Sequence, residues 1–213
     1  MKTTIAFFFL ALSVSLSARS TGDAYTENML IAKIMADTAS TEQTLLQAAN
    51  YFIRIGGVNT DQWLPHYYAA WCFARISHLN HDEDICDKWV DRAQEEVDKA
   101  FDMAPGNDEV LVMKAFVLQA RMNIKPLVRG FQFFQETMDY FDKATGINPA
   151  NPRAYLWKGV NLLHTPEAFG GGKKSGCPLV KEAIARFEAV SVTDPIAPAW
   201  GLEYAREVVK GCD

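Results

Sequence analysis

The segment His78–Asp84 (HLNHDED) holds the residues best suited to chemistry, because two imidazoles three positions apart precede three carboxylates. Imidazole nitrogen and carboxylate oxygen are ligands of zinc, and carboxylate oxygen also binds calcium. The same residue types are common where one helix ends and the next begins, since Asn and Asp cap helices and acidic side chains favour a first helical turn. We therefore interpret the segment as a turn and predict no metal site.

A glycine run followed by two lysines, Gly170–Lys174 (GGGKK), has the composition of a loop that cradles phosphate. The run lacks the preceding strand and the spacing of the phosphate-binding motif. We interpret it as a flexible turn that leads into a helix at Pro178, since proline suits a first helical turn. Contact with a carbohydrate or a peptide through this loop is the functional alternative.

Signals of catalysis are weak in the rest of the chain. The sequence has no GxSxG motif and no cysteine with an evident histidine partner. His66 and His164 stand among apolar residues, where a structural role is the usual one. We predict a non-catalytic protein without a cofactor, and a metal-dependent hydrolase that uses the His78–Asp84 turn is the enzyme alternative.

Composition limits the class of partner. The chain of 213 residues is 49% hydrophobic and 22% charged, which is typical of a globular protein. Its 21 Lys and Arg residues stand against 26 Asp and Glu residues, a formal charge of −5. Such a chain lacks the basic field that nucleic acid or an anionic membrane requires. The composition favours a protein or peptide partner and excludes nucleic acid. It does not distinguish a monomer from a homo-oligomer.

The first 20 residues are typical of a secretory signal peptide. Met1-Lys2 is followed by an apolar run over 5–16, which is too short to cross a bilayer, and the chain turns polar at Arg19. No cysteine stands near the expected cleavage site to carry a lipid anchor, and no second long apolar run predicts membrane insertion. We expect residues 21–213 to form the mature domain, exported to the periplasm or beyond.

A repeat with a period near 45 organises this mature domain. Pro105, Pro149 and Pro195 are spaced 44 and 46 residues apart, and each follows the same pattern of small and large apolar residues at helical spacing. A small residue recurs ten positions after each proline and in a degenerate first copy, where it lets two helices approach closely; the four are Ala70, Ala115, Gly159 and Ala205.

The stretches 93–105, 137–149 and 183–195 resemble the second helix of the tetratricopeptide repeat family. This resemblance implies an all-α, right-handed superhelix of about four helical hairpins plus a terminal helix. The units exceed the usual 34 residues or so, and we place the excess between the two helices of each hairpin. Residues 148–155 and 165–172 also resemble exported bacterial repeat proteins of unknown function. The expected helices are 23–38, 41–56, 62–79, 84–103, 108–122, 130–147, 152–163, 178–192 and 197–211.

Four cysteines remain after the expected cleavage, an even number that suits an oxidising compartment. Cys177 opens one expected helix and Cys212 closes the antiparallel helix that follows, so we predict a disulfide between them. Cys72 and Cys86 form a second candidate pair, but they are offset by about one helical turn from mutual register.

The resemblance also implies a concave groove lined by the first helix of each hairpin. The residues that it places there are Tyr67, Trp71, Arg75, Phe116, Gln119, Leu156, Val160 and Arg206. A lining so rich in aromatic and apolar side chains suits an extended or helical peptide. In the alternative, terminal helices or a neighbouring subunit fill the groove.

The excess residues of each unit emerge along one edge of the stack, and such insertions often mark a binding face. We call this the loop edge, and its candidate binding residues are Arg121, Lys125, Arg129, Phe169, Gly170, Gly171, Gly172 and Lys173. The main functional hypothesis is an exported scaffold that binds a protein or peptide through the groove or the loop edge. The alternative is a small-molecule carrier or accessory protein of an envelope transport system, for which a deep cavity at Trp71 and Phe116 would be evidence.

Overall fold

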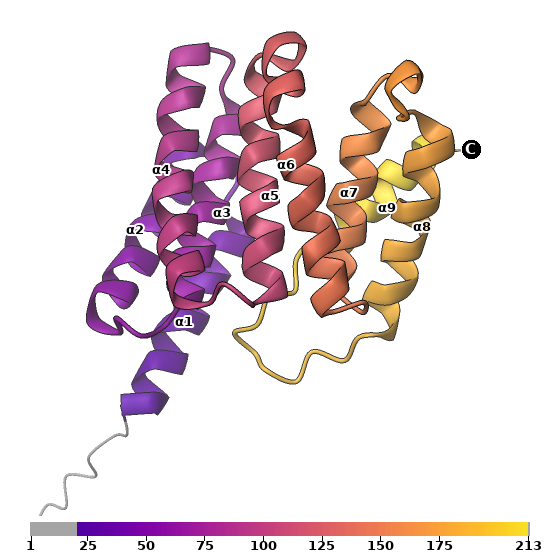
Figure 1. Cartoon of the computed structure of the whole chain (residues 1–213). Helices are drawn as coiled ribbons and strands as arrows, with labels where there is room; N and C mark the ends of the chain where they lie inside the picture. Colours follow the sequence, from indigo (N-terminus) through magenta and orange to yellow (C-terminus); the bar gives the residue numbers. More distant parts are fainter. Residues whose placement is uncertain (1–20, 213) are drawn as a thin grey trace, which may run out of the picture.

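The computed structural model describes residues 21–212, and over this range the chain is all-α (Figure 1). The expected signal peptide, residues 1–20, lies outside the described residues. The helices are α1 (Thr21–Thr38), α2 (Glu42–Val58), α3 (Leu64–Leu79), α4 (Glu83–Met103), α5 (Asp108–Ile124), α6 (Pro126–Ile147), α7 (Pro152–His164), α8 (Lys173–Ala189) and α9 (Leu202–Val209), with short 3-10 helices η1 (Glu167–Phe169) and η2 (Lys210–Cys212).

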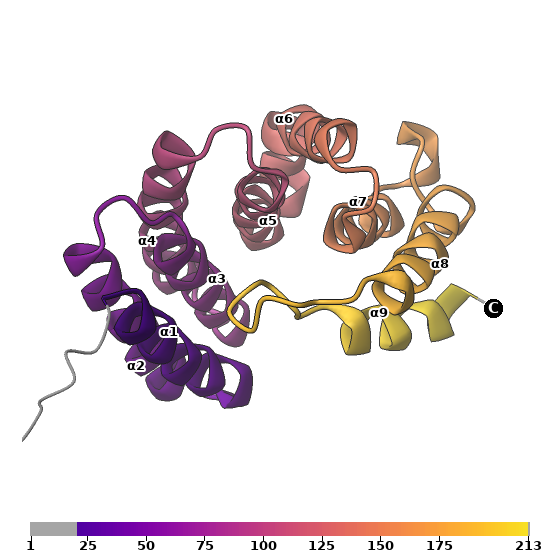
Figure 2. The ribbon, with the colours of Figure 1, turned by 90° about the horizontal axis from the view of Figure 1, so that it is seen from below.

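Successive helices pair as hairpins, α1 with α2, α3 with α4, α5 with α6 and α7 with α8, and α9 packs on α8. The hairpins stand side by side along an arc (Figure 2), with α3, α5 and α7 toward its inner side and α4 and α6 outside. This arrangement confirms the predicted all-α stack of about four hairpins with a terminal helix. The turns within the last three hairpins lie at one end of the stack (Figure 1). This is where the sequence placed the excess residues of each repeat.

Capping side chains and prolines set the helix boundaries. Asp82, Asn107 and Asn151 each accept a hydrogen bond from a backbone N–H in the first turn of the next helix. Helices α4 and α6 each end two residues before a proline, at Pro105 and Pro149, because proline has no N–H to continue the helix. The segment His78–Asp84 is the α3–α4 turn, as interpreted from the sequence.

Small side chains lie where helix backbones approach most closely. Ala70, Ala115 and Ala205 are completely buried. A Cβ atom added to Gly159 of α7 would lie 2.9 Å from Val180 Cγ2 and 3.0 Å from the carbonyl oxygen of Gly176, both on α8. Helices α7 and α8 therefore pack at a distance that only glycine permits at this position.

The prediction is wrong at the C-terminal end. Helix α8 begins at Lys173 and carries Pro178 inside it, and the expected helix over 197–211 is reduced to α9 and η2. Residues 190–201, which we call the strap, are not helical. Three of the four residues over 190–193 are β-branched, which lowers helix propensity. Pro195 and Pro198 restrict the residues before them, and Gly201 has a φ of +115°.

A disulfide joins Cys177 of α8 to Cys212 of η2, with a Cα–Cα distance of 5.7 Å. It closes the C-terminal end of the chain onto α8, as the sequence predicted for this pair. Cys72 and Cys86 do not pair and are buried as free thiols. Burial raises the pKa of Cys72 to about 12, which keeps it protonated and unreactive.

We expect Gly159→Ala to lower the free energy of unfolding by about 1–3 kcal/mol, because the new methyl group overlaps Val180 and the backbone of α8. The control is Gly57→Ala, another glycine-to-alanine change within a helix, where nothing lies within 4 Å of the added Cβ. It should be neutral or raise stability by about 0.5–1 kcal/mol. Urea unfolding of both variants measures the difference, and equal stability would contradict the close packing of α7 and α8.

Candidate functional site

The concave groove is filled by the strap, which crosses the inner side of the arc before the chain enters α9 (Figure 2). Ile196 is buried in the main apolar core. The indole ring of Trp200 stacks on Trp71 with centroids 5.3 Å apart and lies 5.7 Å from the ring of Phe116. The sequence left two possibilities, an open groove and one filled by terminal helices or a neighbouring subunit. The structure fills the groove with the strap, a non-helical segment of the same chain.

Hydrogen bonds hold the strap in place. The Tyr68 hydroxyl donates to the Ile196 carbonyl oxygen at 2.9 Å, and the Trp200 indole N–H donates to the Tyr67 hydroxyl at 3.1 Å. The Arg153 guanidinium donates to the Trp200 carbonyl oxygen at 3.3 Å and to the Glu109 carboxylate at 2.6 Å. Burial alone would lower the pKa of Arg153, but the neighbouring Glu109 carboxylate raises it, so Arg153 stays charged.

The predicted groove residues consequently belong to the packed interior or to ion pairs. Tyr67, Trp71, Phe116, Gln119, Leu156 and Val160 are all buried. Arg75 donates to the carbonyl oxygens of Ala36 and Ala39, where it closes the C-terminal end of α1. Arg206 is exposed on α9 and pairs with Glu188 and Glu203. These side chains stabilise the stack and the strap, and they leave no open peptide groove between them.

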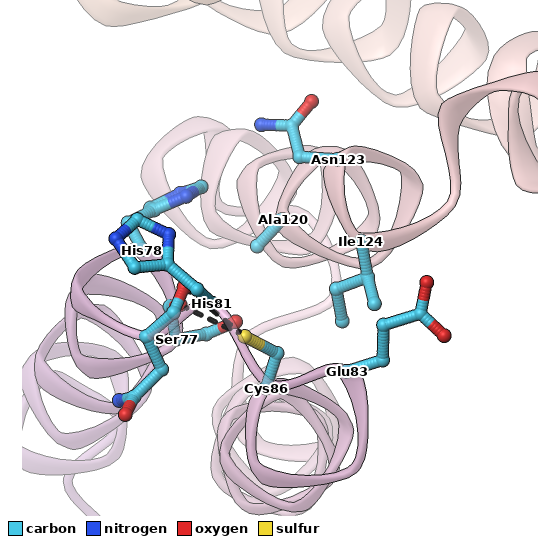
Figure 3. Close-up of a pocket in the computed structure, with 9 residues that line it drawn as sticks. Ser77, His78, His81, Glu83, Cys86, Ala120, Asn123 and Ile124 are labelled. Atoms are coloured by element: carbon cyan, nitrogen blue, oxygen red, sulfur yellow. Dashed lines mark hydrogen bonds between the residues drawn. The ribbon is translucent and has the colours of Figure 1, made fainter.

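A small pocket of about 260 Å³ lies where α3 ends, α4 begins and α5 ends (Figure 3). The Cys86 thiol donates to the Ser77 carbonyl oxygen at 3.3 Å. No three His, Cys, Asp or Glu side chains come together as a metal site among residues 21–212. The pocket is lined by Ser77, His78, Asn80, His81, Glu83, Cys86, Ala120, Asn123 and Ile124.

The loop edge carries a group of exposed apolar side chains that we call the apolar edge: Leu127, Val128 and Phe131 of α6, and Phe169 of η1. Their exposed fractions are 87%, 68%, 77% and 62%. The rings of Phe131 and Phe169 meet edge to face, with centroids 5.7 Å apart and an interplanar angle of 90°. Because exposed apolar patches can serve as interaction sites, we take the apolar edge as the candidate site.

The start of α6 explains why these side chains are exposed. Arg129 points toward α4, where its guanidinium binds the Asp87 carboxylate through two hydrogen bonds and lowers the pKa of Asp87. Leu127 and Phe131 stand on the opposite side of the helix from Arg129, because residues two positions apart are about 200° apart around a helix. Leu127 lies outside the helix expected from residue 130, although Pro126 suits a first helical position. Phe131 lies inside that expected helix, but its exposure could not be read from the sequence.

The glycine run forms a tight turn that leads into α8 at Lys173, not at Pro178 as expected. Gly170 and Gly172 have φ values of +83° and +84°, and a Cβ atom on Gly171 would lie 2.1 Å from the Thr165 carbonyl oxygen. The N–H of Gly172 donates to the Leu162 carbonyl oxygen at 2.9 Å, which ties the turn to α7. The turn therefore requires glycine at all three positions and holds Phe169 at the surface.

Only part of the predicted loop edge is brought together. Phe169, Gly170, Gly171, Gly172 and Lys173 lie on one turn beside Phe131. The predicted cations around the α5–α6 turn serve another purpose, since they pair with acidic residues in the first half of α4. These pairs are Arg121 with Asp91, Lys125 with Glu83, and Arg129 with Asp87.

No protein-family model matches the sequence, and none of the curated proteins matches it. Among solved structures, the chain is similar to the HusA haemophore from Porphyromonas gingivalis, with 29% sequence identity and a TM-score of 0.80. The similarity covers 91% of this chain and 95% of that chain. It therefore extends over the hairpin stack as a whole. Within residues 21–212, no helix has the length and apolar character needed to cross a membrane.

We expect Trp200→Ala to lower the free energy of unfolding by about 2–4 kcal/mol, because the indole fills the space between Trp71 and Phe116. Amide hydrogen exchange in the strap should also become faster, since the strap loses its aromatic anchor. Trp200→Phe retains an aromatic ring but loses the hydrogen bond to Tyr67, so it should lower the free energy of unfolding by less than Trp200→Ala. Unchanged exchange in Trp200→Ala would show that the strap is held by other contacts.

Proposed function

We propose that this protein is a non-catalytic carrier of haem or a chemically related planar ring, and that the ligand binds at the apolar edge. The observation that carries the proposal is the similarity to a haemophore across 91% of this chain. A second, independent observation is that the chain exposes two phenylalanine rings in contact with each other at one end of the stack. The carrier hypothesis is thus better supported than the peptide-binding scaffold.

The chemistry of the apolar edge suits a flat aromatic ligand. A porphyrin ring is apolar over both faces, and its burial against apolar side chains is favoured by the hydrophobic effect. The perpendicular rings of Phe131 and Phe169 offer one face for stacking and one edge for a T-shaped contact. Leu127 and Val128 extend the apolar surface along the first turn of α6. Burial of each exposed ring by a ligand contributes about 1.5–3 kcal/mol at most.

The small pockets and the concave groove fit a ring of this size less well. The pocket beside His78 has a volume of about 260 Å³, and a second pocket beside Tyr51 and Arg54 has about 290 Å³. Both are below the 300–1,000 Å³ or so that encloses a drug-sized ligand. The concave groove is occupied by Trp200 and Ile196 of the strap. Placing a porphyrin there would require the strap to leave the core, so the apolar edge offers the lower barrier to binding.

Export of the mature chain is part of the proposal. The apolar run over 5–16 after a basic start supports a signal peptide, and the disulfide between Cys177 and Cys212 suits an oxidising compartment. Similarity to a haemophore supports the same location outside the cytoplasm.

The proposal is tested by adding haemin to residues 21–213 and following binding through the absorbance of the porphyrin ring. We expect saturable binding that is weakened about tenfold by Phe131→Ala and about tenfold by Phe169→Ala, because each ring contributes roughly 1.4 kcal/mol of contact. Since both side chains are exposed, the melting temperature should not change.

The matched control is the double variant Ile34→Ala/Val58→Ala, which removes exposed apolar side chains from α1 and α2, away from the loop edge. It should bind haemin as the wild type does. Absence of saturable binding by the wild type would contradict the carrier proposal. Full affinity in Phe131→Ala/Phe169→Ala would leave the carrier in place but move its site away from the apolar edge.

A further inference from the structure

Two lysines without a charged partner stand beside the apolar edge. Lys173 and Lys174 are the first residues of α8, four and five positions after Phe169, and both are exposed. Neither makes an ion pair or a side-chain hydrogen bond within the part of the chain that the structure describes. The cations near the start of α6 are different, since Lys125 and Arg129 pair with acidic residues of α4.

The compact glycine turn places the start of α8, where these lysines stand, against η1, which carries Phe169. The N–H of Gly171 donates to the Pro166 carbonyl oxygen at 3.2 Å, so η1 folds back on the end of α7. A Cβ atom on Gly172 would lie 2.6 Å from Cγ of Glu167, which shows that the start of α8 touches η1. The Glu167 side chain packs against the backbone of Gly172, and no ion pair joins it to either lysine within the described residues.

The charge at this turn contrasts with that of the protein as a whole. The chain has a formal charge of −5, which on average disfavours the approach of an anionic ligand. Lys173 and Lys174 directly follow the turn that carries Phe169, and they add positive charge at one end of the apolar edge. A ligand that complements it has a flat apolar body and carboxylates at one side.

We infer that Lys173 and Lys174 bind the carboxylates of a planar ligand whose ring lies on Phe131 and Phe169, so that the apolar edge selects amphipathic ring carboxylates over uncharged rings. This inference rests on the proposed function and adds the groups that orient the ligand. Exposed ion pairs of this kind are individually weak, at about 0.2–1 kcal/mol each, so two of them change affinity by about 2- to 30-fold.

Comparison of protoporphyrin IX with its dimethyl ester tests the inference, because the ester keeps the ring and loses both negative charges. Both ligands are titrated in one detergent-containing buffer into the wild type and Lys173→Gln/Lys174→Gln. We expect the wild type to bind the free acid about three- to tenfold more tightly than the ester at low salt, and the variant to bind both equally. The preference of the wild type should also decrease as salt is added.

The control is Lys88→Gln/Lys143→Gln, which removes the same total charge from exposed sites on α4 and α6. It should retain the preference for the free acid. Equal affinity of the wild type for acid and ester, or an unchanged preference in Lys173→Gln/Lys174→Gln, would overturn the inference while the carrier function stands. Failure of the wild type to bind either ligand would overturn both. Phe131→Ala/Phe169→Ala should weaken both ligands alike, which separates ring contact from charge.

Discussion

The close approach of helix backbones at small residues is the constraint on which the rest of the structure depends. Ala70, Ala115, Gly159 and Ala205 are buried at equivalent places of successive hairpins, and at Gly159 even one methyl group would overlap the facing helix. Regular contacts of this kind align the hairpins in an arc, with their turns at one end. The arc creates a concave side, and it places the α5–α6 and α7–α8 turns next to each other.

The strap determines which of these surfaces is free. An open arc would expose the aromatic side chains of α3 and α5, but Trp200 and Ile196 cover them and convert the concave side into core. Apolar surface remains at the loop edge, where Leu127 and Phe131 in the first turns of α6 are exposed. With the strap absent, this fold would offer a groove for a peptide. With the strap in place, the apolar edge at the end of the stack is the surface that we propose for a small flat ligand.

Periodic features were predictable from the sequence, and features that depend on unique contacts were not. The helices from α2 to α5 and the pairing of Cys177 with Cys212 follow from the repeat and from helix direction. The start of α8 was missed because the preference of Pro178 for a first turn is local, whereas the contact between Gly176 and Gly159 is tertiary. Phe131 was missed because helical periodicity does not show which side of a helix lacks a neighbour.

A haemin titration of the isotope-labelled chain, followed residue by residue through its amide NMR signals, tests the central claim most directly. The account predicts that the largest shifts occur at 126–131 and 167–174, the two segments that form the apolar edge and its lysines, with the strap over 190–201 undisturbed. Shifts concentrated in the strap and in the inner helices α3 and α5 would contradict it, because the ligand would then enter the groove by displacing Trp200.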